Sequence, residues 1–188
     1  GGNVVLNGPD DLSKIVAAVA DSNGKILSYK KSFEDAITAG DNVAILRAGT
    51  YKVPTGKNLT ITGAVDGVVF DNIGAHGMGG ASVTFNNCTF LNKKSSQTGA
   101  DKWTGVNMWG KYEFNNCVFD TEAHCNVKCD GVVAAFNGCS FVDNRDIASV
   151  INNSKPYNDN TNGRKEGEKS AAVAIFRHFL FLSCNFTG

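Results

Sequence analysis

Residues 83–90 read Val-Thr-Phe-Asn-Asn-Cys-Thr-Phe, and this stretch decides the fold because the chain repeats it three more times. The further copies are Tyr-Glu-Phe-Asn-Asn-Cys-Val-Phe at 112–119, Ala-Ala-Phe-Asn-Gly-Cys-Ser-Phe at 134–141, and a degenerate Phe-Leu-Phe-Leu-Ser-Cys-Asn-Phe at 179–186. Their cysteines follow one another at intervals of 29, 22 and 45 residues. Self-similarity with such a period is typical of repeat proteins, in which each unit packs on the next.

The first copy predicts two short strands joined by a bend. Alternate residues of a strand share one face, so Val83 and Phe85 point the same way. The two asparagines that follow favour a bend, because Asn tolerates the left-handed backbone conformation. After the bend, Cys88 and Phe90 again share a face. Stacked copies would therefore place Phe on Phe, Asn on Asn and Cys on Cys, about 4.8 Å apart.

Upstream of the repeats, the sequence predicts a change of structure near residue 42. Short apolar runs at 43–46, 59–62 and 68–70, separated by Gly-, Asn- and Thr-rich turns, indicate strands. Segment 1–41 carries helix signals instead. Asp10 or Asp11 would cap a helix whose apolar face is Leu12, Ile15, Val16 and Val19. Ser32 would begin a second short helix that Gly40 ends. We expect two parts, a capping segment with short helices at 1–41 and a β-domain at 42–188.

Composition limits the partners. The 188 residues contain 18 basic and 18 acidic side chains, so the net charge is zero, which argues against nucleic acid as the main partner. No apolar run approaches the roughly 20 residues of a membrane span, so we expect no membrane insertion. Two polar stretches, 91–110 and 152–170, are expected to be surface loops of the β-domain.

The cysteines divide into two groups. The four repeat cysteines occupy one equivalent inward site, so we expect reduced, stacked thiols that behave as small buried hydrophobes. Cys125 and Cys129 lie outside the repeats, beside His124. A fourth ligand is not evident and the spacing is not that of a zinc knuckle, so a local disulfide or two unpaired thiols is favoured over a metal site. No metal or cofactor is predicted.

The Phe-Asn-(Asn/Gly)-Cys-x-Phe corners resemble those of the pectin-lyase-like superfamily. The runs at 44–51 and 56–63 are similar to its usual first coils, and the resemblance covers roughly residues 42–188. It implies an all-β fold, a right-handed parallel β-helix of about six coils, here with a short amino-terminal helical cap. The superfamily includes lyases, hydrolases, phage tailspikes, adhesins and structural stalks, so the resemblance does not itself choose a function.

The enzymatic alternative rests on acidic residues that follow the repeats. Superfamily members that cleave polysaccharides use paired carboxylates, or an acid cluster with a basic residue, on adjacent coils. Asp120 and Asp143, with Arg145, are the corresponding candidates for catalysis. The family's pectate-lyase and polygalacturonase motifs are absent from this sequence, so a polysaccharide lyase or glycoside hydrolase is the second choice.

The favoured hypothesis is a non-catalytic binding or attachment module that recognises a glycan or a host surface. Its ligand-binding candidates are aromatic residues that could stack on sugar rings, namely Trp103, Trp109, Tyr112 and Tyr157. By its resemblance to tailspikes and surface β-helices, the module would belong to a virion or to the extracellular surface of a cell, in a homotrimer if it resembles tailspikes. A purely structural stalk is the third alternative.

Overall fold

The computed structural model describes residues 9–54, 56–70, 80–91, 104–121, 125–129, 133–143 and 178–187. This part of the chain is mainly β-strand, with two short helices, α1 (Pro9–Lys14) and α2 (Phe33–Ala39). Neither of these helices has the length and hydropathy needed to cross a bilayer.

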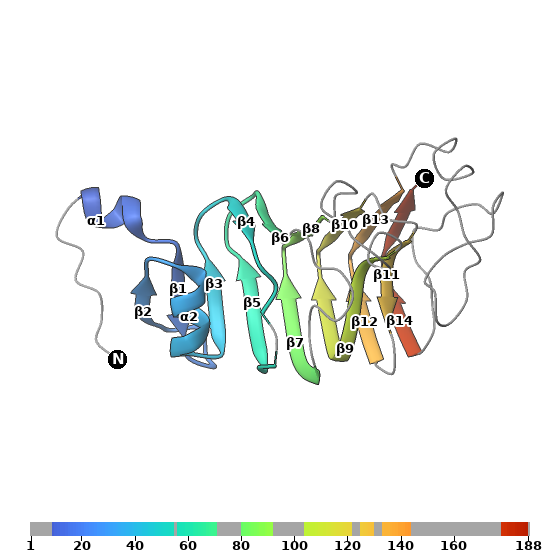
Figure 1. Ribbon diagram of the computed structural model, residues 1–188, viewed down its shortest axis with the longest axis horizontal. Helices are drawn as coiled ribbons and strands as arrows, with labels where there is room; N and C mark the ends of the chain where they lie inside the picture. The colour runs from blue at the N-terminus through green and yellow to red at the C-terminus, as the bar shows by residue number, and fades with distance from the viewer. Residues whose placement is uncertain are drawn as a thin grey trace.

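The strands of the described residues form two main sheets, and from β3 to β10 successive strands alternate between them. The members of the large sheet, named in chain order, are β1 (Ala17–Ala20), β2 (Ile26–Lys30), β3 (Asn42–Ile45), β5 (Leu59–Gly63), β7 (Gly80–Asn86), β9 (Thr104–Asn115), β11 (Cys125–Cys129), β12 (Val133–Asn137) and β14 (His178–Leu182). In space, β2 is at one edge beside β1, and β11 pairs with β9 alone. The small sheet contains β4 (Gly49–Tyr51), β6 (Val68–Phe70), β8 (Thr89–Phe90), β10 (Val118–Thr121), β13 (Ser140–Asp143) and β15 (Asn185–Thr187). Among the described strands from β3 to β15, every pairing of one with another is parallel. Figure 1 shows the large-sheet strands side by side along the long axis of the molecule.

The repeat register is confirmed. Phe85, Phe114 and Phe136 are paired across β7, β9 and β12. The predicted bends between the large and small sheets are also confirmed, because the residue after the paired Asn position has a positive φ in each copy. These residues are Asn87 (57°), Asn116 (53°), Gly138 (62°) and Ser183 (51°). Left-handed backbone at one fixed position turns each repeat from the large sheet into the small one.

Between the sheets, phenylalanine rings form the core in two columns. The large-sheet column stacks Phe85, Phe114 and Phe136 with centroids 5.6 and 5.1 Å apart. The small-sheet column stacks Phe70, Phe90, Phe119 and Phe141 at 5.7, 5.0 and 4.9 Å. Rings of opposite columns meet edge to face, the geometry that the ring quadrupole favours. Phe33 of α2 contacts Phe70 edge-on, so α2 closes the amino-terminal end of this core.

The first predicted helix is wrong beyond Lys14. The chain forms β1 there, which pairs antiparallel with β2 on one side and β3 on the other. Ala17, Ala18 and Val19 are all buried, so the short apolar run belongs to a strand flanked by two others. The second helix is confirmed, with Ser32 Oγ accepting from the Asp35 amide and the Gly40 amide donating to Ala36 O.

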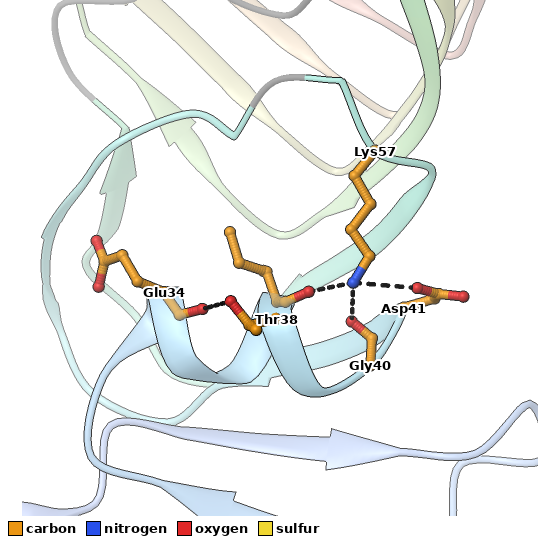
Figure 2. Close-up of polar contacts among 6 residues, drawn as sticks. Glu34, Thr38, Gly40, Asp41 and Lys57 are labelled. Carbon is orange, nitrogen blue, oxygen red and sulfur yellow. Dashed lines mark hydrogen bonds and ion pairs between the residues drawn. The ribbon is translucent and has the colours of Figure 1, made fainter.

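Two basic side chains donate hydrogen bonds to backbone carbonyls at the carboxyl-terminal ends of the helices. Arg47 donates through Nη2 to Ser13 O at 2.7 Å and through Nε to Ile15 O at 3.1 Å, at the end of α1. Lys57 Nζ donates to the carbonyls of Ile37 and Gly40 at the end of α2, and forms an ion pair with Asp41 at 3.3 Å (Figure 2). Both helix ends are therefore fixed to the first strands of the parallel stack, where a positive charge complements the helix dipole.

The predicted surface loop 91–110 is wrong over its last seven residues. Residues 104–110 belong to β9, whose first part pairs with β11 (Cys125–Cys129) and whose second part pairs with β7 and β12. The predicted loop 152–170 lies outside the described residues. The boundary predicted at residue 41 falls between α2 and β3, although β1 and β2 extend the large sheet into the amino-terminal segment.

Candidate ligand-binding groove on the outer face of the large sheet

The outer face of the large sheet carries polar side chains in register. Thr60, Thr84 and Glu113 occupy paired positions on β5, β7 and β9, and Ala135 follows on β12. Thr60, Thr84 and Glu113 each lie between two buried residues of their own strand, and Ala135 is followed by a buried residue. Because successive side chains of a strand point to opposite faces, these four point away from the phenylalanine core. The side chains therefore form a row that runs across the strands.

A second polar row, formed by Asn58, Ser82 and Lys111, runs parallel to the first and lies two residues earlier in the chain at β5, β7 and β9. Ser82 pairs with Lys111, and the Ser82 amide donates to Asn58 Oδ1 at 2.9 Å. Asn58, Ser82 and Lys111 are all exposed. The second row thus offers an amide, a hydroxyl and an ammonium group to solvent.

These two rows border a groove of about 750 Å³, a size that accommodates small-molecule ligands. Its lining also includes exposed Asp41 at one end and Ala135 at the other, over a floor of Leu59, Val83 and Tyr112. We call this feature the outer groove. The charged residues of its lining are Asp41, Lys111 and Glu113, so it has no strong charge of either sign.

An asparagine ladder borders the first row on its far side. Asn137 Nδ2 donates to Asn115 Oδ1 at 2.7 Å, Asn115 Nδ2 to Asn86 Oδ1 at 2.8 Å, and Asn86 Nδ2 to Thr62 Oγ1 at 3.1 Å. Asn137 Nδ2 also donates to Glu113 Oε1 at 3.3 Å. The asparagine side chains of the ladder therefore hydrogen-bond to one another and to Thr62, and Asn137 orients the carboxylate of Glu113 within the outer groove.

The aromatic residues that were predicted to bind a ligand do not line up as an exposed stacking surface in the described part of the structure. Tyr112 lies in the groove floor, but it is only 3% exposed and its ring stacks on Phe114 at 6.3 Å. The prediction that Tyr112 offers an exposed ring to a sugar is therefore wrong, because its strand position points into the core. Trp109 lies in β9 with its side chain outside the described part of the structure, and Trp103 and Tyr157 lie outside the described residues altogether.

The two predicted catalytic acids are on neighbouring strands of the small sheet. Asp120 of β10 pairs with Val142 of β13, and Asp143 pairs with Thr121, so the two acids occupy consecutive rather than equal register positions. The Asp143 side chain and all of Arg145 lie outside what the structure describes. Their role in catalysis stays a prediction.

The four repeat cysteines are free thiols, as predicted. Cys88, Cys117 and Cys139 are buried, and Cys184 is half-buried. The thiols of the last three donate to the phenylalanine carbonyl of the preceding repeat, at 3.5 Å to Phe85 O, 3.3 Å to Phe114 O and 3.2 Å to Phe136 O. Burial raises the pKa of Cys117 well above its usual value and the pKa of Cys88 to about 12.

The free energy of unfolding should fall at alkaline pH because the buried thiol of Cys88 resists ionisation in the folded protein. The unfolded thiol ionises near its ordinary pKa of 9.0 and the folded thiol near 12, so its contribution is complete below pH 9 and is lost as the pH rises toward 12. At pH 10.5 the expected loss is about 2 kcal/mol. Urea unfolding of the wild type and of Cys88→Val at pH 8 and pH 10.5 measures it, because other titrating groups are common to both. Equal losses in the two proteins would contradict the prediction.

Metal ligation finds no support within the described ranges, where no three His, Cys, Asp or Glu side chains gather closely enough to hold an ion. The side chains of Cys125 and Cys129 lie outside the description, so the choice between a disulfide and two thiols stays open.

The outer-groove residues were missed by the sequence reasoning. Reading the outward positions of successive repeats as columns would have found Ser82 beside Lys111 and Thr84 beside Glu113.

Comparisons with protein-family models, with curated proteins and with solved structures find no match to this chain.

Proposed function

We propose that this protein is a non-catalytic module that binds glycans through the outer groove and that it is built as a right-handed parallel β-helix. The observation that carries the glycan proposal is the pair of in-register polar rows bordering a groove of about 750 Å³. The proposed setting is a virion or an extracellular cell surface, where such a module would attach its parent protein to a surface glycan.

The fold proposal is supported by the strand order. Successive strands alternate between two parallel sheets, and each new strand is added beside its counterpart from the preceding repeat. Left-handed bends recur at one position, and the phenylalanine columns continue from repeat to repeat. A parallel β-helix accounts for all of these features with one repeated unit.

The glycan proposal is supported by the chemistry of the lining. Sugar hydroxyls both donate and accept hydrogen bonds, and the groove offers groups of both kinds, with Thr84 and Ser82 hydroxyls at its centre and the Asn58 amide at one end. Paired strands hold these groups in fixed positions, which reduces the entropy lost on binding. The mixed charges of Lys111 and Glu113 favour an uncharged glycan over a polyanion.

A glycan array with a reducing-end assay on every hit tests the proposal. We expect binding without release of sugar ends, and an affinity reduced about tenfold or more by Thr84→Val, which removes one hydroxyl from the groove at nearly constant shape. The matched control is Thr89→Val on β8 of the small sheet, which is expected to bind as the wild type does. Release of sugar ends would support the enzymatic alternative, and absence of glycan binding would overturn the proposal.

A further inference from the structure

We propose that Cys139 and Cys184 form a redox switch, a pair of thiols that a small disulfide compound such as glutathione disulfide converts into a disulfide bond. The bond ties the last described repeat to the repeat before it. The register of the two cysteines and the partial exposure of one of them support the switch. The switch is independent of the proposed glycan function.

The two cysteines occupy equivalent positions of neighbouring repeats. Asn137 pairs with Leu182 before them, and Ser140 pairs with Asn185 after them. The Asn185 amide donates to Cys139 O at 2.8 Å, so the two backbones are hydrogen-bonded at the cysteines themselves. Figure 1 shows β12 and β14, the strands that lead into these bends, side by side. Paired strands lie about 4.8 Å apart, a Cα separation within the roughly 4.4–6.8 Å that disulfides bridge.

The two thiol groups are in contact. Cys139 Sγ donates to Phe114 O at 3.3 Å, and Cys184 Sγ donates to Phe136 O at 3.2 Å, so both thiols are directed toward the preceding repeat. A side-chain hydrogen bond also joins the two cysteines to each other. Because the thiol is a weak donor, formation of the disulfide gives up only weak hydrogen bonds.

A position at the end of the stack distinguishes this pair from the other repeat cysteines. Cys88, Cys117 and Cys139 are buried and Cys184 is half-buried, so a reagent from solvent reaches the column of thiols at Cys184. β14 and β15 end their sheets among the described strands, whereas the strands that flank Cys117 are paired on both sides. The last described repeat can therefore make the shift of about 1 Å that brings the two Cβ atoms from about 4.8 Å to the roughly 3.8 Å of a disulfide.

The chemistry is thiol–disulfide exchange in two steps. The accessible Cys184 thiolate attacks one sulfur of glutathione disulfide, which forms a mixed disulfide and releases one glutathione thiolate. The Cys139 thiolate then attacks the Cys184 sulfur, which forms the protein disulfide and releases the second glutathione. The two thiol protons pass to the two departing glutathiones. The two electrons lost by the protein thiols reduce the glutathione disulfide.

The surroundings of the two sulfurs favour Cys139 as the attacking thiol of the second step. A hydrogen bond with the Cys117 side chain lowers the pKa of Cys139, although burial opposes it. Burial raises the pKa of Cys184. Because the thiolate is the attacking species, the buried Cys139 is the better nucleophile, and Cys184 is the sulfur that the reagent reaches.

Peptide mapping of the whole protein tests the switch. The protein is equilibrated in glutathione buffers from reducing to oxidising, alkylated, and digested with trypsin and Asp-N without reduction. Cleavage before Asp130 separates Cys129 from Cys139, and cleavage after Arg177 isolates Cys184. We expect residues 130–142 and 178–188 to be joined in oxidising buffer. The melting temperature should rise by about 5 °C, because a link across 45 residues restricts the unfolded chain.

Two variants assign the effect. Cys184→Ser should abolish both the link and the oxidative rise in melting temperature, whereas Cys88→Ala, at the other end of the column, is the matched control and should retain both. A link from Cys184 to Cys125 or Cys129 overturns the proposal, and so does a Cys184 that stays reduced or stops at the mixed disulfide with glutathione. A rise that persists in Cys184→Ser also contradicts it. The wild-type peptide map decides the question even where a variant folds poorly.

Discussion

Phe114→Ala is expected to lower the free energy of unfolding by about 3–5 kcal/mol, the range for phenylalanine removed from a packed core. Phe114 is fully buried and its ring contacts those of four other phenylalanines. It stacks between Phe85 and Phe136 and meets Phe90 and Phe119 edge-on. Truncation to alanine would interrupt the large-sheet column and remove its edge-to-face contacts with the small-sheet column. Urea unfolding followed by tryptophan fluorescence and circular dichroism measures the loss.

Two controls separate ring packing from generic loss of apolar area. Phe114→Leu keeps most of the volume and should cost about 1.5 kcal/mol or less if the neighbours repack. Leu12→Ala, on a side chain that is 55% exposed, should change stability by no more than about 0.5 kcal/mol. Losses below about 1 kcal/mol for both Phe114→Ala and Phe136→Ala would contradict the repeat register.

The repeat core could be predicted from the sequence because its signals are local. Alternation in Val83-Thr84-Phe85 sets which side chain points inward, and the asparagines that follow set where the chain bends. All four copies of the repeat predict the same inward positions and the same bend, so the prediction does not depend on how many residues separate one copy from the next. The register of Phe85, Phe114 and Phe136 then follows from stacking like on like.

Where apolar runs are short, local signals were ambiguous. Leu12, Ile15, Val16 and Val19 fit one helical face, yet the chain leaves α1 at Lys14 and forms β1. Strand pairing on both sides of β1 outweighs the weak helix propensity of so short a segment. The same competition places residues 104–110 in β9, because that stretch finds partners in β11 and β7 that sequence periodicity does not reveal.

The outer groove could not be predicted residue by residue because it exists only between repeats. Thr84 and Glu113 are 29 positions apart and become neighbours only when the register is known. The search for aromatic rings that could stack on sugars also selected Tyr112, whose position among the alternating inward and outward residues of its strand places it in the core. The contacts of Arg47 and Lys57 with helix carbonyls are likewise long-range and depend on where the helices end.

Gly63→Ala should destabilise the protein by about 3 kcal/mol, the upper part of the range for overpacking a core. Gly63 ends β5 where the chain leaves the large sheet, and it is buried. A Cβ there would lie 2.5 Å from the Asn87 carbonyl oxygen and 3.1 Å from Val68 Cβ. The oxygen belongs to the next bend, which Asn87 N fixes by donating to Asn115 O at 2.9 Å. Relief of the clash therefore requires two neighbouring repeats to separate.

The sign of this prediction opposes backbone propensity, since alanine in a strand is favoured over glycine by about 0.5–1 kcal/mol. Gly49→Ala, at the start of β4, is the matched control because its nearest neighbour, Tyr51 Oη, would be at an ordinary 3.5 Å. We expect Gly49→Ala to be neutral or slightly stabilising in the same urea experiment. If Gly63→Ala is equally mild, the bends of adjacent repeats are not packed backbone against backbone. Close stacking of the bends would then no longer explain why the repeats remain in register.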